Sequence, residues 1–119
     1  MLILIAGPYR SGTNNDPHLI EKNLQKLESY ALPIFRLGHM PIVGEWLALP
    51  LMKLAGSKEV GDEIFHEIQY PAAHRMLVKC DAVLRIEGAS NGADQDVEVA
   101  KKLGLKIYYK LEDIPKVDS

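Results

Sequence analysis

The sequence lacks several features that would assign it to particular classes of protein. It has a single cysteine, Cys80, so it cannot form an internal disulfide, and it has no C-x-x-C pair of the kind that binds zinc. The four histidines share no spacing with carboxylates, so we expect neither a metal ion nor a cofactor. We expect Cys80 to be a small buried residue rather than a reactive thiol.

The chain also has no cluster of basic residues. Its 14 Lys and Arg are balanced by 16 Asp and Glu, which gives a formal net charge of -2. This charge argues against a nucleic acid polymer or an anionic membrane surface as the partner. The opening stretch MLILIAGPYR has no basic start, and its apolar run is too short for a signal segment or a membrane span. We therefore predict a cytoplasmic protein with no membrane partner.

What is present is typical of a globular protein. Apolar residues make up 47% of the 119 residues and charged residues 25%, a balance that argues against disorder. A chain of this length is in the usual range for one hydrophobic core. We expect residues 1–119 to form a single domain.

Short apolar runs alternate with helical patterns along the chain. The predicted strands are residues 2–6, 40–43, 81–87 and 105–109. The predicted helices are a first one that begins at Asp16–Pro17, is disturbed by Pro33 and ends at Gly38, then 45–56 interrupted by Pro50, 62–79 punctuated at Pro71, and a last one that begins close to Gly92. This alternation predicts an α/β protein: a three-layer, flavodoxin- or Rossmann-like domain with a four- to five-stranded parallel sheet.

The two most glycine-rich loops follow the first and third predicted strands. They are GPYRSGTNND (7–16) and EGASNGAD (87–94). Because the carboxyl ends of parallel strands meet at one edge of the sheet, we expect both loops to lie there, where ligands bind in such folds.

Asp96 has an unusual place on the helix that follows the second of these loops. On a helical wheel it falls within an apolar arc formed by Val99, Ala100 and Leu103, whereas Glu98 points toward solvent. Near a helix start, the backbone N–H groups should keep the pKa of this carboxyl low. Two interpretations stay open: Asp96 caps its own helix, or it faces a cavity as a nucleophile or as a stabiliser of an oxocarbenium ion.

The loop residues also have two interpretations each. Ser90 and the N–H groups around Gly92 form an anion site or an ordinary loop. Tyr9 and Arg10 contact a sugar, a carboxylate or a phosphate, or lie on the surface. Asp81 begins the third predicted strand and acts either as an acid or as a local cap.

Three stretches of the chain resemble the nucleoside 2-deoxyribosyltransferase-like superfamily, most closely its small bacterial and phage branch. The first two are LIAGPYRSG (4–12), which resembles the family's opening strand and loop, and FRLGHMPIV (35–43), which resembles the approach to its second strand. The third is CDAVLRIEGASNGADQDVEVAKKLGLKIYY (80–109), with Cys-Asp, Ser-x-Gly-Ala and the helix that carries the nucleophile. Residues 45–70 match poorly.

The resemblance implies roles for three residues. Asp96, four residues after Gly92, takes the place of the carboxylate that attacks C1′ of the nucleoside, and Tyr9 orients it. Asp81 is the nearest match for the acid that handles the base. The family's nucleophile is normally Glu, so the shorter Asp implies either a deeper substrate or a slow, altered or inactive member.

The same resemblance indicates the substrate and the assembly. Members with Ser at the position of Ser90 act on 5′-monophosphates, so a nucleotide is favoured over a nucleoside, with Arg10 nearby. We add Gly7, Asn91 and Gly92 to the predicted binding residues. The implied activity is cleavage or transfer of an N-glycosidic bond, as in a deoxyribonucleoside 5′-monophosphate N-glycosidase or a deoxyribosyltransferase. The alternatives are a nucleotide-binding or sensing module without chemistry, and a structural protein without a small ligand.

Members of the family assemble with their sites near subunit contacts, so we expect a homo-oligomer. EWLALPLMKLAG (45–56) is the candidate surface for self-association, and core packing explains the same stretch.

Overall fold

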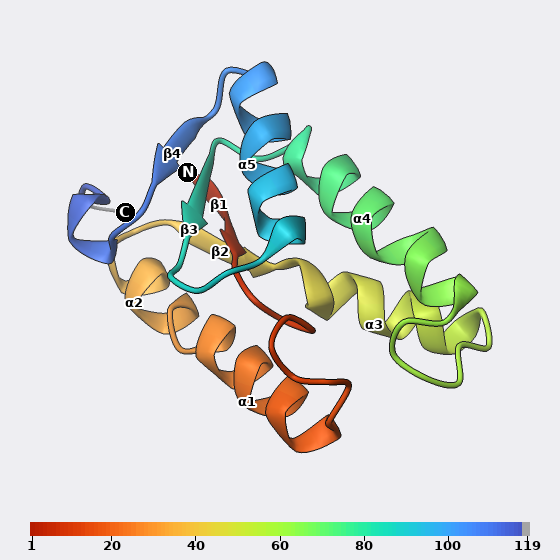
Figure 1. The fold of residues 1–119 in the computed structure, drawn as a ribbon. Helices are drawn as coiled ribbons and strands as arrows, with labels where there is room; N and C mark the ends of the chain where they lie inside the picture. Colours follow the sequence, from red (N-terminus) through yellow and green to blue (C-terminus); the bar gives the residue numbers. More distant parts are fainter. Residues whose placement is uncertain (118–119) are drawn as a thin grey trace.

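The computed structural model describes residues 1–117, and it is a parallel sheet with helices on both faces (Figure 1). The sheet has four strands in the order β2-β1-β3-β4. In chain order the elements are β1 (Leu2–Ala6), α1 (Pro17–Glu28), α2 (Ala31–Arg36), β2 (Met40–Val43), α3 (Gly44–Leu54), α4 (Glu63–Leu77), β3 (Ala82–Arg85), α5 (Asn91–Lys102), β4 (Lys106–Tyr108) and the 3-10 turn η1 (Leu111–Asp113). The predicted three-layer, flavodoxin-like α/β fold is therefore confirmed.

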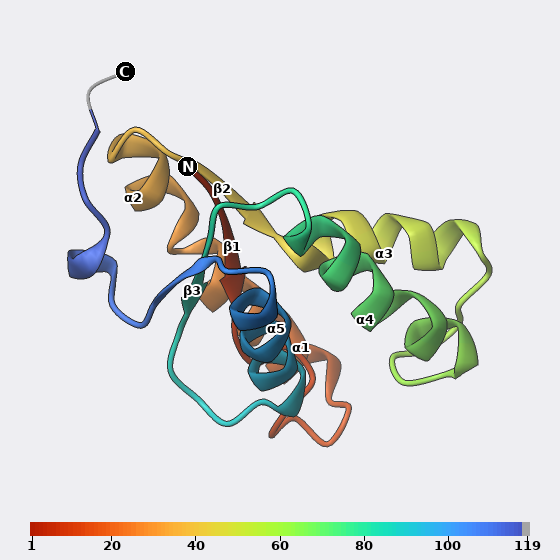
Figure 2. The same ribbon diagram turned by 90° about the horizontal axis from the view of Figure 1, so that it is seen from above.

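The central strand β1 explains why its sequence is a continuous apolar run. Ile3 and Ile5 pack into one core cluster together with Leu27 of α1. Leu4 packs into a second cluster, on the side of α4 and α5, with Leu77. Successive side chains of a strand point to opposite faces, so a strand covered on both faces needs apolar residues at every position. Figure 2 shows the helices on the two sides of this sheet.

The prolines affect the helices differently from the prediction. The first helical region breaks at residues 29–30, ahead of Pro33, which lies in the first turn of α2. A proline is tolerated there because the N–H groups of a first turn have no partner within the helix. The interruptions expected at Pro50 and Pro71 were wrong, because each lies inside one continuous helix, α3 or α4.

Helices α3 and α4 pack against each other, and their far ends extend beyond the sheet (Figures 1 and 2). Leu47, Leu51 and Leu54 of α3 are exposed, while Ala48 and Met52 are buried. The stretch 45–56 thus has both a core face and an exposed apolar face, and self-association through it stays a prediction. No helix within residues 1–117 has the length and apolarity needed to cross a lipid bilayer.

Parallel pairing brings the carboxyl ends of β1, β2 and β3 to one edge of the sheet. The β1–α1 loop (7–16) and the β3–α5 loop (86–90) leave from this edge. Strand β2 has no such loop, because α3 begins at Gly44, directly after Val43. The first turn of α3 therefore lies at the same edge as the two loops.

Candidate functional site

A cavity of about 80 Å³ lies at the carboxyl edge of the sheet. Its walls come from the end of β1, the loop after it, the first turn of α3, helix α4 and the start of α5. Most of the predicted site residues line this cavity: Gly7, Tyr9, Arg10, Ser90, Gly92 and Asp96. The sequence separates the first three from the last three by about 80 residues, and the fold brings them together.

Asp96 lies in the second turn of α5, since Ser90 is the N-cap and the helix begins at Asn91. The helix start is capped by the Ser90 hydroxyl, which accepts a hydrogen bond of 3.1 Å from the N–H of Ala93. The interpretation of Asp96 as a cap of its own helix was therefore wrong. Its side chain is 13% exposed and points into the cavity from the buried side of α5.

The pKa of Asp96 also differs from the expectation. Burial raises it to about 7, and the positive charge of Arg85 opposes only part of this increase. A side chain in the second turn is beyond the free N–H groups and outside the main influence of the helix dipole, which is strongest in the first turn. Without those partners, desolvation decides the pKa of the buried carboxyl.

Three buried polar atoms near the cavity have no hydrogen-bond partner among the described residues. They are Oδ1 of Asp96, Nε2 of His74 and Oε1 of Gln69. His74 Nε2 lies 3.5 Å from Asp96 Oδ1, which is too long for a good hydrogen bond. Buried polar atoms are nearly always paired in folded proteins, so a group of unpaired ones beside a cavity marks where a polar ligand would bind.

Glu45 is a site residue that the sequence analysis missed. It is the second residue of α3, its exposed fraction is only 8%, and it lines the cavity. Burial raises its pKa to about 7, as does the negative charge of Asp96, whereas hydrogen bonds from its own backbone and from Gln69 lower it. A signal was available: Glu45 lies two residues after the end of a predicted strand and begins an otherwise apolar stretch.

Tyr9 lies beside this second carboxyl group. Tyr9 is 9% exposed and packs into a cluster with residues of α1, α3 and α4, including Ala48 and Phe65. Burial and the negative charges of Glu45 and Glu21 raise the pKa of its phenol. The phenol therefore stays protonated at neutral pH and is able to donate a hydrogen bond.

Arg10 connects the β1–α1 loop with the loop before α4. Its Nε donates a hydrogen bond of 2.8 Å to Oδ1 of Asn15, and its guanidinium carbon lies 5.8 Å from the centre of the Phe65 ring. Gly61 has a φ of +92°, and a Cβ there would collide with the guanidinium. Arg10 thus holds the two loops together and also lines the cavity.

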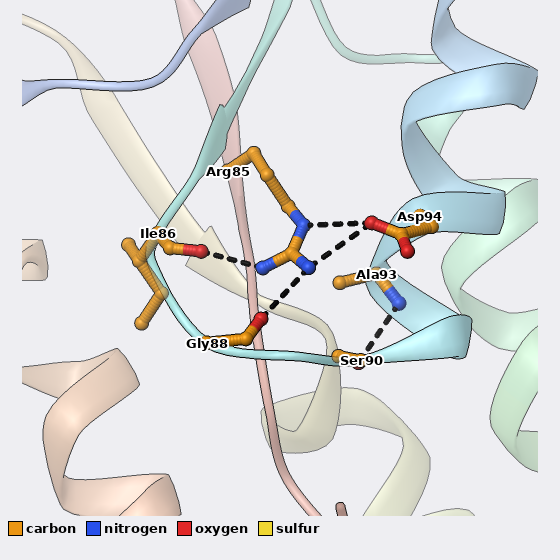
Figure 3. A network of polar contacts seen from close by, with 6 residues as sticks. All are labelled: Arg85, Ile86, Gly88, Ser90, Ala93 and Asp94. Atoms are coloured by element: carbon orange, nitrogen blue, oxygen red, sulfur yellow. Dashed lines mark hydrogen bonds and ion pairs between the residues drawn. The ribbon is translucent and has the colours of Figure 1, made fainter.

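The loop that leads into α5 is fixed by Arg85, at the end of β3 (Figure 3). The Arg85 guanidinium donates to Oδ1 of Asp94 at 3.0 Å and to the carbonyl of Gly88 at 2.9 Å. Its side chain is only 10% exposed, so the ion pair with Asp94 is well shielded on the arginine side. This network fixes the start of the helix that carries Asp96.

Two of the predicted site residues, Asp81 and Asn91, do not line the cavity. Asp81 is at the opposite, amino edge of the sheet, where its Oδ2 accepts a hydrogen bond of 2.7 Å from the N–H of Leu2. The catalytic role expected for Asp81 is therefore corrected to a structural one, which joins the starts of β1 and β3. Asn91 is exposed and lines a neighbouring groove, which shares Ser11 and Ser90 with the cavity.

No cluster of three or more His, Cys, Asp or Glu side chains that would hold a metal ion occurs among residues 1–117. The cavity wall instead offers two carboxyl groups, two phenols, an amide and a guanidinium. These groups are able to bind a polar organic ligand and to move protons.

No protein-family model matches the chain, and no curated protein matches its sequence. Among solved structures, the chain is similar to a 2-deoxyribosyltransferase from the psychrotolerant bacterium Bacillus psychrosaccharolyticus, a biocatalyst for the synthesis of antiviral and antitumoral nucleosides. The TM-score is 0.63 at 16% identity, and the match covers 90% of this chain and 69% of that chain. This similarity shows a shared α/β fold.

Proposed function

We propose that the protein breaks the N-glycosidic bond of a nucleoside or nucleotide, by hydrolysis or by transfer, with Asp96 as the nucleophile. One observation carries the proposal. The Asp96 carboxyl is 13% exposed, its Oδ1 has no hydrogen-bond partner among the described residues, and it shares a cavity with Tyr9. A buried carboxylate without a partner is costly to keep, and this cost is common at catalytic sites. The shared fold with a 2-deoxyribosyltransferase supports the same assignment.

In the proposed reaction, a carboxylate oxygen of Asp96 attacks C1′ as the bond from C1′ to the base breaks. The product is a glycosyl ester of Asp96, which water or a second base then resolves. The ionised form of Asp96 is the reactive one. Arg85 favours this form because its positive charge lowers the pKa of Asp96.

A phosphate on the sugar would lie near the start of α5. The Ser90 hydroxyl already accepts a hydrogen bond from Ala93, so its own proton is left to donate to a phosphate oxygen. The first turn of α5 adds free N–H groups and the positive end of the helix dipole. Arg10 lines the same cavity and supplies a cation. These groups support a nucleoside 5′-monophosphate as the substrate.

The activity is tested by incubating the protein with all common deoxynucleosides and their 5′-monophosphates, and by measuring free base by chromatography. We expect base release from at least one monophosphate and none from Asp96→Asn. Glu98→Gln is the matched control, because Glu98 lies one half-turn further along α5 and its side chain is 67% exposed. Failure of the unmodified protein to release base from any of these compounds would contradict the proposal.

A second candidate is a nucleotide-binding protein without chemistry, and the pKa of Asp96 favours it. At a pKa of about 7, roughly half of the Asp96 side chains are protonated at neutral pH, and a protonated carboxyl is a poor nucleophile. Thermal melting in the presence of each nucleotide distinguishes the two candidates. A nucleotide that raises the melting temperature and is recovered intact favours binding alone.

A further inference from the structure

We propose that Glu45 is the proton donor to the departing base, and that Glu45 and Asp96 hold one proton between them, with Glu45 protonated and Asp96 ionised. This inference rests on the proposed function. It assigns to a residue of α3 the acid role that the sequence analysis gave to Asp81.

The strand order places the two carboxyl groups on either side of the reacting position. Strand β1 lies between β2 and β3. Glu45 follows β2 and Asp96 lies on the helix after β3, so they reach the cavity over the end of β1 from its two sides. Two carboxyl groups that flank a glycosidic bond, one as acid and one as nucleophile, are the arrangement of retaining glycoside hydrolases.

Burial disfavours the state in which both groups are ionised together at neutral pH. The exposed fraction is 8% for Glu45, and 13% for the Asp96 side chain, and each negative charge disfavours the other. When two carboxyl groups share a poorly solvated site, one of them keeps its proton to a higher pH than usual.

The surrounding charges decide which group keeps the proton. Asp96 has the positive charge of Arg85 nearby, which favours its ionised form, and the His74 ring lies 3.5 Å from its Oδ1. Glu45 forms no ion pair with any residue in 1–117. Its neighbours are the neutral amide of Gln69 from α4, the phenol of Tyr9 from the β1–α1 loop, and the negative charge of Asp96 from α5.

The proton balance of the reaction then closes without any other group. As Asp96 attacks C1′, the electron pair of the C1′–N bond goes to the base, and the proton of Glu45 is transferred to that base. In the second step Glu45 acts as a base instead of an acid. Its carboxylate takes a proton from the attacking water while the oxygen of that water replaces Asp96 at C1′. Glu45 ends protonated and Asp96 ionised, as they began.

Two substrates with different leaving groups test this role. One is the deoxynucleoside monophosphate found to react, and the other is 4-nitrophenyl 2-deoxyriboside 5′-phosphate, whose nitrophenolate leaves without a proton. General acid catalysis contributes about 100- to 10,000-fold, so Glu45→Gln should lower kcat/KM for the nucleotide by about 100-fold or more. The same variant should keep most of its kcat/KM for the nitrophenyl compound, because this constant does not include the later step in which Glu45 takes a proton from water. The remaining activity also shows that the variant is folded.

Two matched variants complete the experiment. Asp96→Asn should lose activity on both substrates, because both need the nucleophile. Glu63→Gln should leave the activity on both substrates unchanged. Glu63 lies in the first turn of α4, as Glu45 lies in the first turn of α3, but Glu63 is exposed.

Equal losses of Glu45→Gln on both substrates, or no loss on either, would overturn the role of Glu45 while leaving the proposed function intact. No activity of the unmodified protein on either substrate would overturn the proposed function, and this inference with it.

If Glu45→Gln does not fold, the pH profile of the unmodified protein decides. We expect kcat/KM for the nucleotide to fall as pH rises above about 7, the pKa of Glu45, because the donor loses its proton. The nitrophenyl substrate should show no such decrease. Identical profiles for the two substrates would overturn the proposal.

Discussion

Replacement of Glu45 by Gln should make the protein more stable at alkaline pH. The pKa of Glu45 is raised from 4.5 to about 7 in the folded protein. A group with a raised pKa in the folded state contributes stability that is fully present below its unfolded pKa, and that is lost as pH rises through the folded pKa. At 1.36 kcal/mol for each pH unit between the two values, the loss is about 3 kcal/mol above pH 7.

Gln cannot ionise, so Glu45→Gln should have nearly the stability of the unmodified protein near pH 4.5 and exceed it by up to about 3 kcal/mol at pH 8. For a chain of 119 residues this corresponds to roughly 10 °C in melting temperature. The pKa of Asp96 is also raised to about 7, so its ionisation should lower the stability of both proteins further over the same pH range.

Urea denaturation followed by circular dichroism, at intervals from pH 4.5 to 8.5, measures this difference. Glu63→Gln is the control, since an exposed glutamate in a first turn should change stability by a few tenths of a kcal/mol at every pH. If Glu45→Gln and the unmodified protein keep the same difference in stability across the whole pH range, the Glu45 carboxyl is not buried in the way described.

Three further predictions concern the rest of the site and its support. Asp81→Asn should cost about 1 kcal/mol in a denaturation experiment, because its hydrogen bond with the N–H of Leu2 is weakened, yet should keep full activity. Arg85→Met should move the acidic limb of the pH profile of kcat/KM to higher pH, because the positive charge that lowers the pKa of Asp96 is removed; an unmoved limb would contradict this. Gly7→Ala should cost about 1–3 kcal/mol, measured as a lower midpoint in urea, because the added Cβ would overlap a core side chain at the end of β3.

The strands and the edge that they share were predictable because both follow from local patterns. A continuous apolar run, such as residues 2–6, requires cover on two faces, and parallel pairing then places the loops after β1 and β3 together. Those rules were sufficient to bring Tyr9 and Asp96 to one cavity. They do not depend on which side chains later pack around that cavity.

Properties that depend on long-range packing were not predictable in the same way. The pKa of Asp96 was expected to be low because Asp96 was placed in the first turn of its helix, but the helix begins at Asn91, five residues before Asp96, and Asp96 therefore lies in the second turn. Asp81 was placed at the site because it is the nearest match to the acid of the family that the chain resembles, but it precedes β3, so it lies at the amino edge. A position before or after a strand decides the edge of the sheet on which a residue lies.

The missed residue Glu45 shows what a helix that starts without a loop does to a sheet edge. Because α3 begins at Gly44, one residue after β2, its first turn is held directly over the carboxyl edge. A carboxyl in that turn is not free to reach solvent as it would be in a flexible loop, and it becomes buried against the helices that carry Asp96 and Gln69. Each of the two buried carboxyl groups, Glu45 and Asp96, therefore lowers the stability of the protein at alkaline pH. Packing alone gives no reason to keep two such groups at one cavity, since an apolar pair would be more stable, whereas the acid and nucleophile chemistry that we propose requires both.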